Sequence, residues 1–194
     1  MKLRLDVAVP TKKEWIELVM ANFDDFLIDH AENERKAQAM ALSFVAKYPA
    51  KTKIIPSLIK HAMEELEHFR DVYDYMHERN LQLPQKISED KYAKELMSMT
   101  RSGYEDRFLD RLCLASVMEV RGGERFRLVE EALDEGPMKE FYKILWRVEA
   151  KHGDAFVNMA LEYFPESKVF DRLKYFNEAE GKLVERMELR PTMH

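Results

Sequence analysis

The amino-acid sequence predicts an all-α protein built on a four-helix bundle. Its 194 residues include only 6 glycines and 7 prolines, well below the roughly 12% that these two residue types usually contribute together. The stretches between them carry apolar residues at steps of three and four, and none shows the alternation typical of a strand. The chain is 46% hydrophobic, which is enough apolar material for the core of one domain.

The helices are expected in the following order. A short one follows Pro10, where Thr11 and Glu14 have the spacing of a capping box. The four bundle helices are expected over residues 22–48, 54–80, 106–135 and 139–164. A crossover helix over 89–101 separates the two pairs, and an amphipathic helix over 168–188 ends the chain.

Composition argues against several classes of protein. The net charge is −5 and the pI about 5.8, which disfavours a large basic surface for nucleic acid. Cys113 is the only cysteine, so an internal disulfide is impossible, and its apolar neighbours predict a core position. No stretch approaches the ~18 apolar residues of a membrane span, and no signal peptide is visible. A cytoplasmic protein with no membrane contact is expected.

Acidic residues interrupt the apolar seams of the predicted bundle. Glu34, Glu65 and Glu119 each lie on the seam of a different helix. A buried carboxylate costs several kcal/mol unless something pairs with it. Two of the helices also carry Glu-x-x-His, namely Glu65 with His68 and Glu149 with His152. Residues three apart share a helix face, so the carboxylate and the imidazole of each motif can reach one metal ion.

The spacing of these residues indicates two similar helix pairs. Glu34 precedes Glu65 by 31 residues, and Glu119 precedes Glu149 by 30. Four helices that present such a set inward form the carboxylate-bridged two-metal site of ferritin-like proteins. Four carboxylates and two imidazoles suit iron or manganese, and four acids would neutralise two divalent ions. The predicted ligands are Glu34, Glu65, His68, Glu119, Glu149 and His152. Residues 1–194 are thus expected to form one ferritin-like domain, with its bundle core over about 22–165.

Several residues near this set have more than one interpretation. The acids could instead pair with Arg or Lys, which is the expectation for Glu124, although it could also support or join the metal ligands. His30 is expected to hold Glu34 rather than to bind metal itself. The pair Gly122–Gly123 indicates either close helix packing or open space beside the metals, with a π-bulge. The remaining histidines are expected at the surface: His61, His77 and His194.

Four segments resemble the MiaE-type tRNA hydroxylases, over roughly residues 12–165. They read LIDHAENERKA at 27–37, EELEHF at 64–69, MEVRGGERF at 118–126 and EAKH at 149–152. The resemblance implies a non-haem di-iron monooxygenase that uses O₂ to hydroxylate the isopentenyl group of 2-methylthio-N6-isopentenyladenosine in tRNA. It implies the same six ligands, with Glu65 and Glu149 bridging two iron ions. A separate electron-donor protein is also implied, because the chain has no flavin or nicotinamide fingerprint.

Other functions fit the same residues. A ferritin-like iron oxidase or storage protein would use the same ligands without an organic substrate, and a di-iron hydroxylase could act on another small molecule. A metal-free helical adaptor would use the six residues as buried ion pairs. The oligomeric state stays open. Because the chain is acidic, tRNA would need a local basic cluster, for which the candidates are Arg35–Lys36, Lys47 with Lys51 and Lys53, and Arg121 with Arg125 and Arg127.

Overall fold

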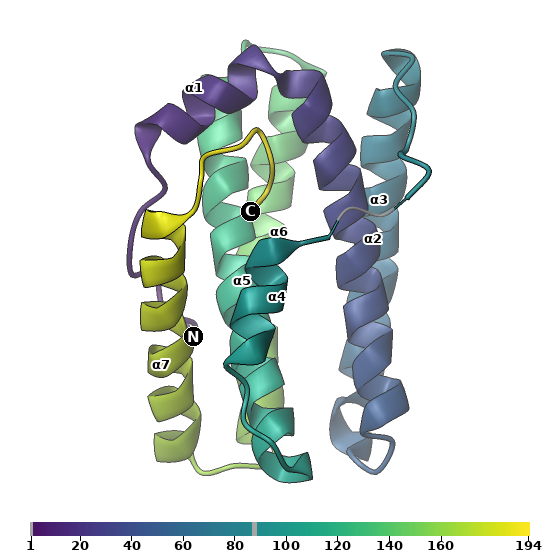
Figure 1. Ribbon diagram of the computed structural model, residues 1–194. Helices are drawn as coiled ribbons and strands as arrows, with labels where there is room; N and C mark the ends of the chain where they lie inside the picture. The colour runs from purple at the N-terminus through teal and green to yellow at the C-terminus, as the bar shows by residue number, and fades with distance from the viewer. Residues whose placement is uncertain (1, 87–88) are drawn as a thin grey trace. The chain divides into compact units, whose positions relative to one another are not determined.

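The computed structural model describes residues 2–86 and 89–194, and within these residues the chain is helical with no strand (Figure 1). The prediction of an all-α protein is confirmed, and the expected helix ends lie within three residues of the observed ones. The described helices, with one 3-10 turn (η1), are α1 (Lys13–Ala21), α2 (Phe23–Lys47), η1 (Thr52–Ile54), α3 (Ile55–Glu78), α4 (Lys91–Ser98), α5 (Tyr104–Ala132), α6 (Pro137–Leu161) and α7 (Glu166–Arg186). None of the helices described is long and apolar enough to cross a membrane.

The chain divides into two compact units, which are described separately. One consists of Glu17–Glu89 with Arg190–His194 and contains α2 and α3. The other consists of Met1–Ile16 with Asp90–Leu189 and contains α4 to α7. The expectation of a single domain over residues 1–194 stays a prediction.

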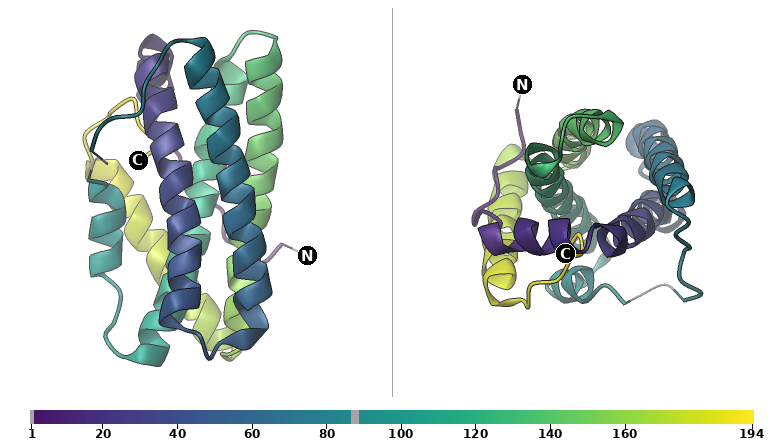
Figure 2. Two further views of the ribbon diagram at one scale, coloured as in Figure 1. Left: turned by 90° about the vertical axis from the view of Figure 1, so that its right-hand side faces the viewer. Right: turned by 90° about the horizontal axis from the view of Figure 1, so that it is seen from above.

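In the first unit, α2 and α3 lie side by side and run antiparallel (Figure 2). Their facing sides bury large apolar residues, including Phe26 and Phe44 on α2 and Val72 on α3. Pro56 stands in the first turn of α3, where a missing N–H costs no helical hydrogen bond. The C-terminal residues return to α2, where the backbone N–H of Met193 donates to Asp29 at 2.6 Å.

In the second unit, α5 is the central helix and contacts α4, α6 and α7. Gly123 permits its close approach to α6, because a Cβ there would lie 3.3 Å from the Glu149 Cβ and from the Trp146 carbonyl oxygen. The helix is regular through Gly122 and Gly123, so the expected π-bulge is absent there, and close packing is the correct interpretation for Gly123. Ser116 adds a hydrogen bond across the same interface, from its hydroxyl to the Gly153 carbonyl at 2.8 Å.

Cys113 is buried on α5, as predicted, and its thiol lies 3.7 Å from the Val169 carbonyl oxygen of α7. Burial raises the pKa of this thiol from 9.0 to about 12. Because the thiolate is the reactive form, the native protein keeps Cys113 chemically inert at neutral pH.

The N-terminal segment shows a different cap from the one expected. In a capping box the backbone N–H of Thr11 would bond to Glu14, but it donates instead to the carboxylate of Glu124 at 2.8 Å. The Thr11 hydroxyl donates to the same carboxylate at 2.6 Å. The capping-box prediction is therefore wrong, because a carboxylate from α5 satisfies the groups that a local partner would otherwise take.

Asp110 joins three parts of the second unit. Its buried carboxylate accepts hydrogen bonds from the backbone and guanidinium of Arg101 and from the guanidinium of Arg172 on α7. Burial opposes the charge of Asp110, but the hydrogen bonds from Arg101 and Arg172 outweigh it and hold its pKa below the ordinary 3.8. The ionised carboxylate thus stabilises the connection from α4 to α5 and the docking of α7.

This arrangement predicts an acid-sensitive contribution to stability. Because the pKa of Asp110 is lowered in the folded state, its ionised carboxylate stabilises the folded protein at pH values above the unfolded pKa of 3.8. This stabilisation is lost as the pH falls through the lower pKa of the folded state. Asp110→Asn should cost roughly 1.5–3 kcal/mol at pH 7, the usual value of hydrogen bonds to a charged group, and should flatten the decline of stability below about pH 4. Urea unfolding at several pH values measures both effects, with the exposed Asp171→Asn as control; parallel pH profiles for the wild type and Asp110→Asn would contradict the assignment.

Candidate metal centre

The α2–α3 pair brings three predicted ligands together on its buried side. Glu34 projects from α2, and Glu65 and His68 project from α3, three residues apart on one face. His68 Nδ1 lies 3.7 Å from an oxygen of Glu34 and 3.7 Å from an oxygen of Glu65. One ligand atom from each of the three lies within 4.8 Å of the others.

The α5–α6 pair brings together the other three. Glu119 projects from α5, and Glu149 and His152 project from α6. His152 Nδ1 lies 3.0 Å from an oxygen of Glu149 and 3.9 Å from an oxygen of Glu119. Here too, one ligand atom of each residue lies within 4.8 Å of the others. Each helix pair therefore presents one Glu and one Glu-x-x-His as a compact group.

The chemistry of each group fits a divalent metal ion. Two carboxylates held within a few ångströms of each other in a buried site repel, and one divalent ion cancels their charge. Carboxylate oxygens with one imidazole are the donors that iron and manganese accept in such proteins. The donor set of each helix pair thus matches a metal site.

Each carboxylate of the α2–α3 group also has a histidine one turn earlier on its own helix. His30 Nε2 forms a hydrogen bond of 2.7 Å with an oxygen of Glu34, and both side chains are buried. This agrees with the expectation that His30 holds Glu34. The corresponding residue on α3 is His61, whose Nδ1 lies 3.4 Å from an oxygen of Glu65.

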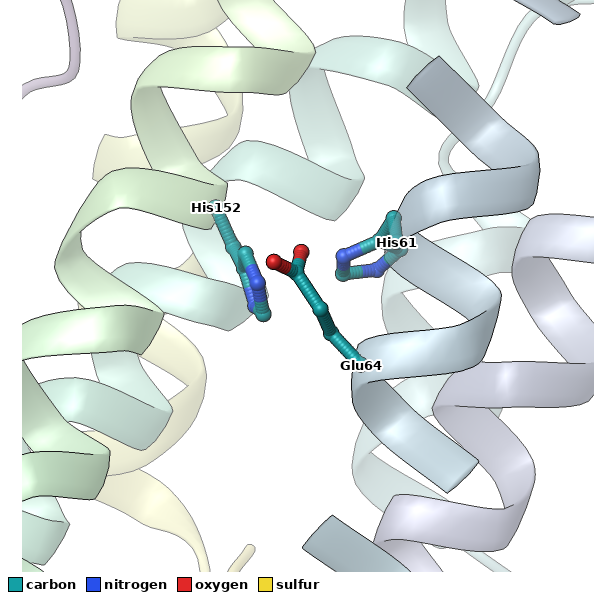
Figure 3. Close-up of side chains that lie close together, drawn as sticks. All are labelled: His61, Glu64 and His152. Atoms are coloured by element: carbon teal, nitrogen blue, oxygen red, sulfur yellow. The ribbon is translucent and has the colours of Figure 1, made fainter. Parts of the chain in front are cut away.

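His61 corrects the sequence interpretation, which placed it at the surface. Only 3% of it is exposed. The signal was present in the sequence, because residues 61, 65 and 68 repeat at steps of four and three and so share the inner face of α3. Figure 3 shows His61 and Glu64 projecting from α3 and His152 projecting from α6. Glu64 pairs with Lys60 at 2.5 Å, and its carboxylate also points toward His61, with an oxygen within 4.8 Å of a ring nitrogen (Figure 3).

Groups that hold a metal-binding carboxylate or imidazole tune its affinity for the metal. His61→Leu should therefore weaken metal binding by about 10- to 100-fold while the helix pair stays folded. Competition against a metal-binding dye measures the affinity, and circular dichroism checks the fold. His77→Leu, at an exposed position of the same helix, is the matched control. Equal affinities for the His61 and His77 variants would show that the 3.4 Å contact with Glu65 has no role in binding.

Glu124 and two of the basic tRNA-binding candidates form a separate buried cluster. Glu124 accepts a hydrogen bond from Thr11 and another, of 2.8 Å, from Arg121. It therefore forms an ion pair with an arginine, as the sequence analysis expected. Arg121 is fully buried and binds Glu180 of α7 through two nitrogens, at 2.6 and 2.9 Å. Arg125 is also buried, with its guanidinium 4.8 Å from the centre of the Trp15 ring.

Arg121 and Arg125 are therefore excluded as surface contacts for a nucleic acid. Burial opposes the charge of Arg121, but its hydrogen bond with Glu180 outweighs this and raises the pKa above the ordinary 12.5. For Arg125 burial is the largest effect and lowers the pKa to about 10, so this side chain is still cationic at neutral pH. Of this candidate trio, only Arg127 has an exposed side chain.

Comparison with known proteins identifies the family. The family model described as tRNA-(MS2IO6A)-hydroxylase (MiaE) matches residues 4–194, nearly the whole chain. The chain belongs to the MiaE family. A MiaE relative from Pseudomonas putida, named tRNA 2-(methylsulfanyl)-N(6)-isopentenyladenosine(37) hydroxylase, is 32% identical over 176 residues, covering 91% of this chain and 85% of the relative. A relative of the same name from Salmonella typhimurium is 31% identical over 132 residues, covering 68% of this chain and 48% of that protein.

A solved structure supports the fold class of this MiaE protein. "Protein 43 with aldehyde deformylating oxygenase activity from Synechococcus" matches with a TM-score of 0.90 and 31% identity, over 97% of this chain and 94% of the other. This likeness confirms the predicted all-α, ferritin-like fold class. The six-residue ligand set, divided three and three between the helix pairs, stays a prediction.

Proposed function

We propose that this MiaE protein hydroxylates the isopentenyl group of 2-methylthio-N6-isopentenyladenosine in tRNA, in an O₂-dependent reaction at a centre of two iron ions. Family membership over residues 4–194 supports the substrate. The observation that carries the chemistry is the pair of buried groups, each with one Glu and one Glu-x-x-His. An adaptor that used these residues only as ion pairs would have no need for this repeated donor set.

The six ligands of the proposed centre are those of the two helix pairs. Glu34, Glu65 and His68 would hold one iron ion, and Glu119, Glu149 and His152 the other. Glu65 and Glu149, the acids of the Glu-x-x-His motifs, would bridge the two. When bound in their reduced form, the metals would supply two electrons to O₂, so that one oxygen atom enters the C–H bond and the other leaves as water, and a separate donor protein would restore the two electrons. The donor protein and a cytoplasmic location belong to the same proposal.

The protein itself positions the carboxylate and imidazole donors and excludes water from them. The hydrogen bond from His30 fixes the orientation of the Glu34 carboxylate. Gly123 lets the backbone of α5 approach the start of the Glu149 side chain, because a Cβ at this position would lie 3.3 Å from the Glu149 Cβ. The donors are themselves shielded from water, since Glu65 is 1% and Glu149 is 3% exposed.

The proposal is tested by loading the protein anaerobically with Fe(II), removing excess metal, and supplying O₂, a reductase system and tRNA from a strain that lacks the hydroxylated base. We expect two iron ions per chain and a modified nucleoside heavier by one oxygen atom in mass spectrometry. A loaded protein that leaves the nucleoside unchanged, yet oxidises Fe(II) and deposits it in a large shell, would instead support the iron-storage alternative.

A further inference from the structure

One segment of this acidic chain contains no acidic residue at all. Between Glu34 and Glu64 lie 29 residues without Asp or Glu, although the chain carries 36 such residues in 194. The same segment holds six cationic residues: Arg35, Lys36, Lys47, Lys51, Lys53 and Lys60. The net charge of the whole chain is −5, so the residues outside this segment together carry −11.

The fold places this segment at one end of the α2–α3 hairpin. It covers the C-terminal part of α2, the turn η1 and the first turns of α3. Lys36 and Lys47 are 11 residues apart on one helix, a separation of roughly 17 Å along its axis. Lys47 and Lys53 are exposed on either side of the turn, and 73% of the Lys60 side chain is exposed. Lys47, Lys53 and Lys60 are thus exposed cations at this end of the hairpin, and together with Lys36 we call them the basic hairpin end.

We propose that the basic hairpin end binds the phosphate backbone of the tRNA substrate near the modified adenosine. This inference rests on the proposed function. Lysines that contact phosphates release bound counterions, and this release supplies much of the affinity for RNA. Because the residues outside this segment together carry −11, their net charge opposes the binding of a polyanion and favours the segment without acidic residues. Among the candidates that the sequence offered, Lys47 and Lys53 are exposed and Arg35 and Lys36 are partly exposed, whereas Lys51 is buried and is not part of this surface.

The decisive experiment compares two pairs of lysine substitutions with equal charge change. Lys47→Gln with Lys53→Gln removes charge from the basic hairpin end, and Lys174→Gln with Lys182→Gln removes it from exposed positions of α7. The probe is a fluorescent anticodon stem-loop RNA without modifications, and its anisotropy gives Kd at several salt concentrations. Two lost phosphate contacts should raise Kd about 15-fold near 0.15 M salt and reduce the salt slope by about 1.4. The α7 variant should bind as the wild type does.

The outcomes separate this inference from the proposed function. Equal RNA affinity for both double variants and the wild type, with hydroxylation intact, would overturn the basic hairpin end and leave the function standing. A wild type that neither binds the RNA nor hydroxylates tRNA would overturn both. In turnover, the Lys47 and Lys53 variant should raise KM for tRNA with little change in kcat.

A lipid surface is the competing occupant of this end, because Leu42, Ile59 and Met63 expose apolar side chains in the same segment. Co-sedimentation with vesicles of phosphatidylglycerol and phosphatidylcholine provides the second arm of the test. Loss of vesicle binding by the Lys47 and Lys53 variant, without loss of RNA binding, would assign the basic hairpin end to a membrane and overturn the proposal.

Discussion

Glu65→Ala should reduce the iron retained after anaerobic loading from two ions per chain to one or none, and should lower tRNA hydroxylation more than about 100-fold. Losing a residue that merely supports a ligand costs about 10- to 100-fold, and losing a bridging ligand should cost more. Glu65 is buried on α3, with His68 at 3.7 Å and His61 at 3.4 Å. Metal analysis by mass spectrometry and single-turnover hydroxylation measure the two effects.

The stability of the metal-free protein distinguishes a metal ligand from a structural ion pair. If Glu65 is a ligand, the metal-free Glu65→Ala variant should be at least as stable as the wild type, since it loses a buried charge near Glu34. Iron should then raise the melting temperature of the wild type more than that of the variant. If Glu65 is only half of an ion pair, its removal should cost about 3–5 kcal/mol without any metal, which would contradict the assignment. Glu67→Ala, exposed two residues later, is the control.

Arg121→Met should have the largest effect on folding, a loss of about 3–5 kcal/mol in the free energy of unfolding. Arg121 and Glu180 are both 0% exposed, and they are joined by two hydrogen bonds of 2.6 and 2.9 Å. Arg121 also donates to the Val9 carbonyl at 2.7 Å and to Glu124 at 2.8 Å. Removing the guanidinium leaves Glu180 buried beside Tyr92 without this cation, which is the costly half of breaking a buried pair.

Urea unfolding followed by circular dichroism measures this loss. Arg127→Met, six residues later on α5, is the matched control: its side chain is 52% exposed and lies 3.8 Å from Glu131, so it should change stability by less than about 1 kcal/mol. Similar midpoints for the two variants would show that the Arg121–Glu180 pair does not hold α7 and the N-terminal segment against α5.

The helices of this protein were predictable because their signals are local. Apolar steps of three and four and the breaks at Gly136 and Pro137 depend only on neighbouring residues, so the observed ends fall within three residues of the expected ones. The candidate ligands were predictable for a related reason. A carboxylate among the apolar positions of a helix, such as Glu119, is costly to bury, and such a position can be recognised from the sequence alone.

The exposure and partners of several charged residues were not predictable in this way. Arg121 and Arg125 lie in a basic stretch that was taken as a surface candidate, yet the fold buries both. The partner of Arg121 is Glu180, 59 residues away, and the partner of Thr11 is Glu124, 113 residues away. His61 is a different case, because its spacing of four from Glu65 already indicated the inner face of α3 and the sequence analysis overlooked it.

The sequence by itself determined the all-α class, the course of the helices and the two groups of Glu and His that face inward. Those features follow from periodicity and from the cost of burying charge, and both act over a few turns of one helix. Only the tertiary structure decided which charges are buried as pairs, such as Arg121 with Glu180. It also decided that Lys47 and Lys53 are exposed on either side of the turn between α2 and α3, whereas Lys51 between them is buried. Pairing and exposure depend on packing between segments far apart in the chain, and helix periodicity carries no information about that packing.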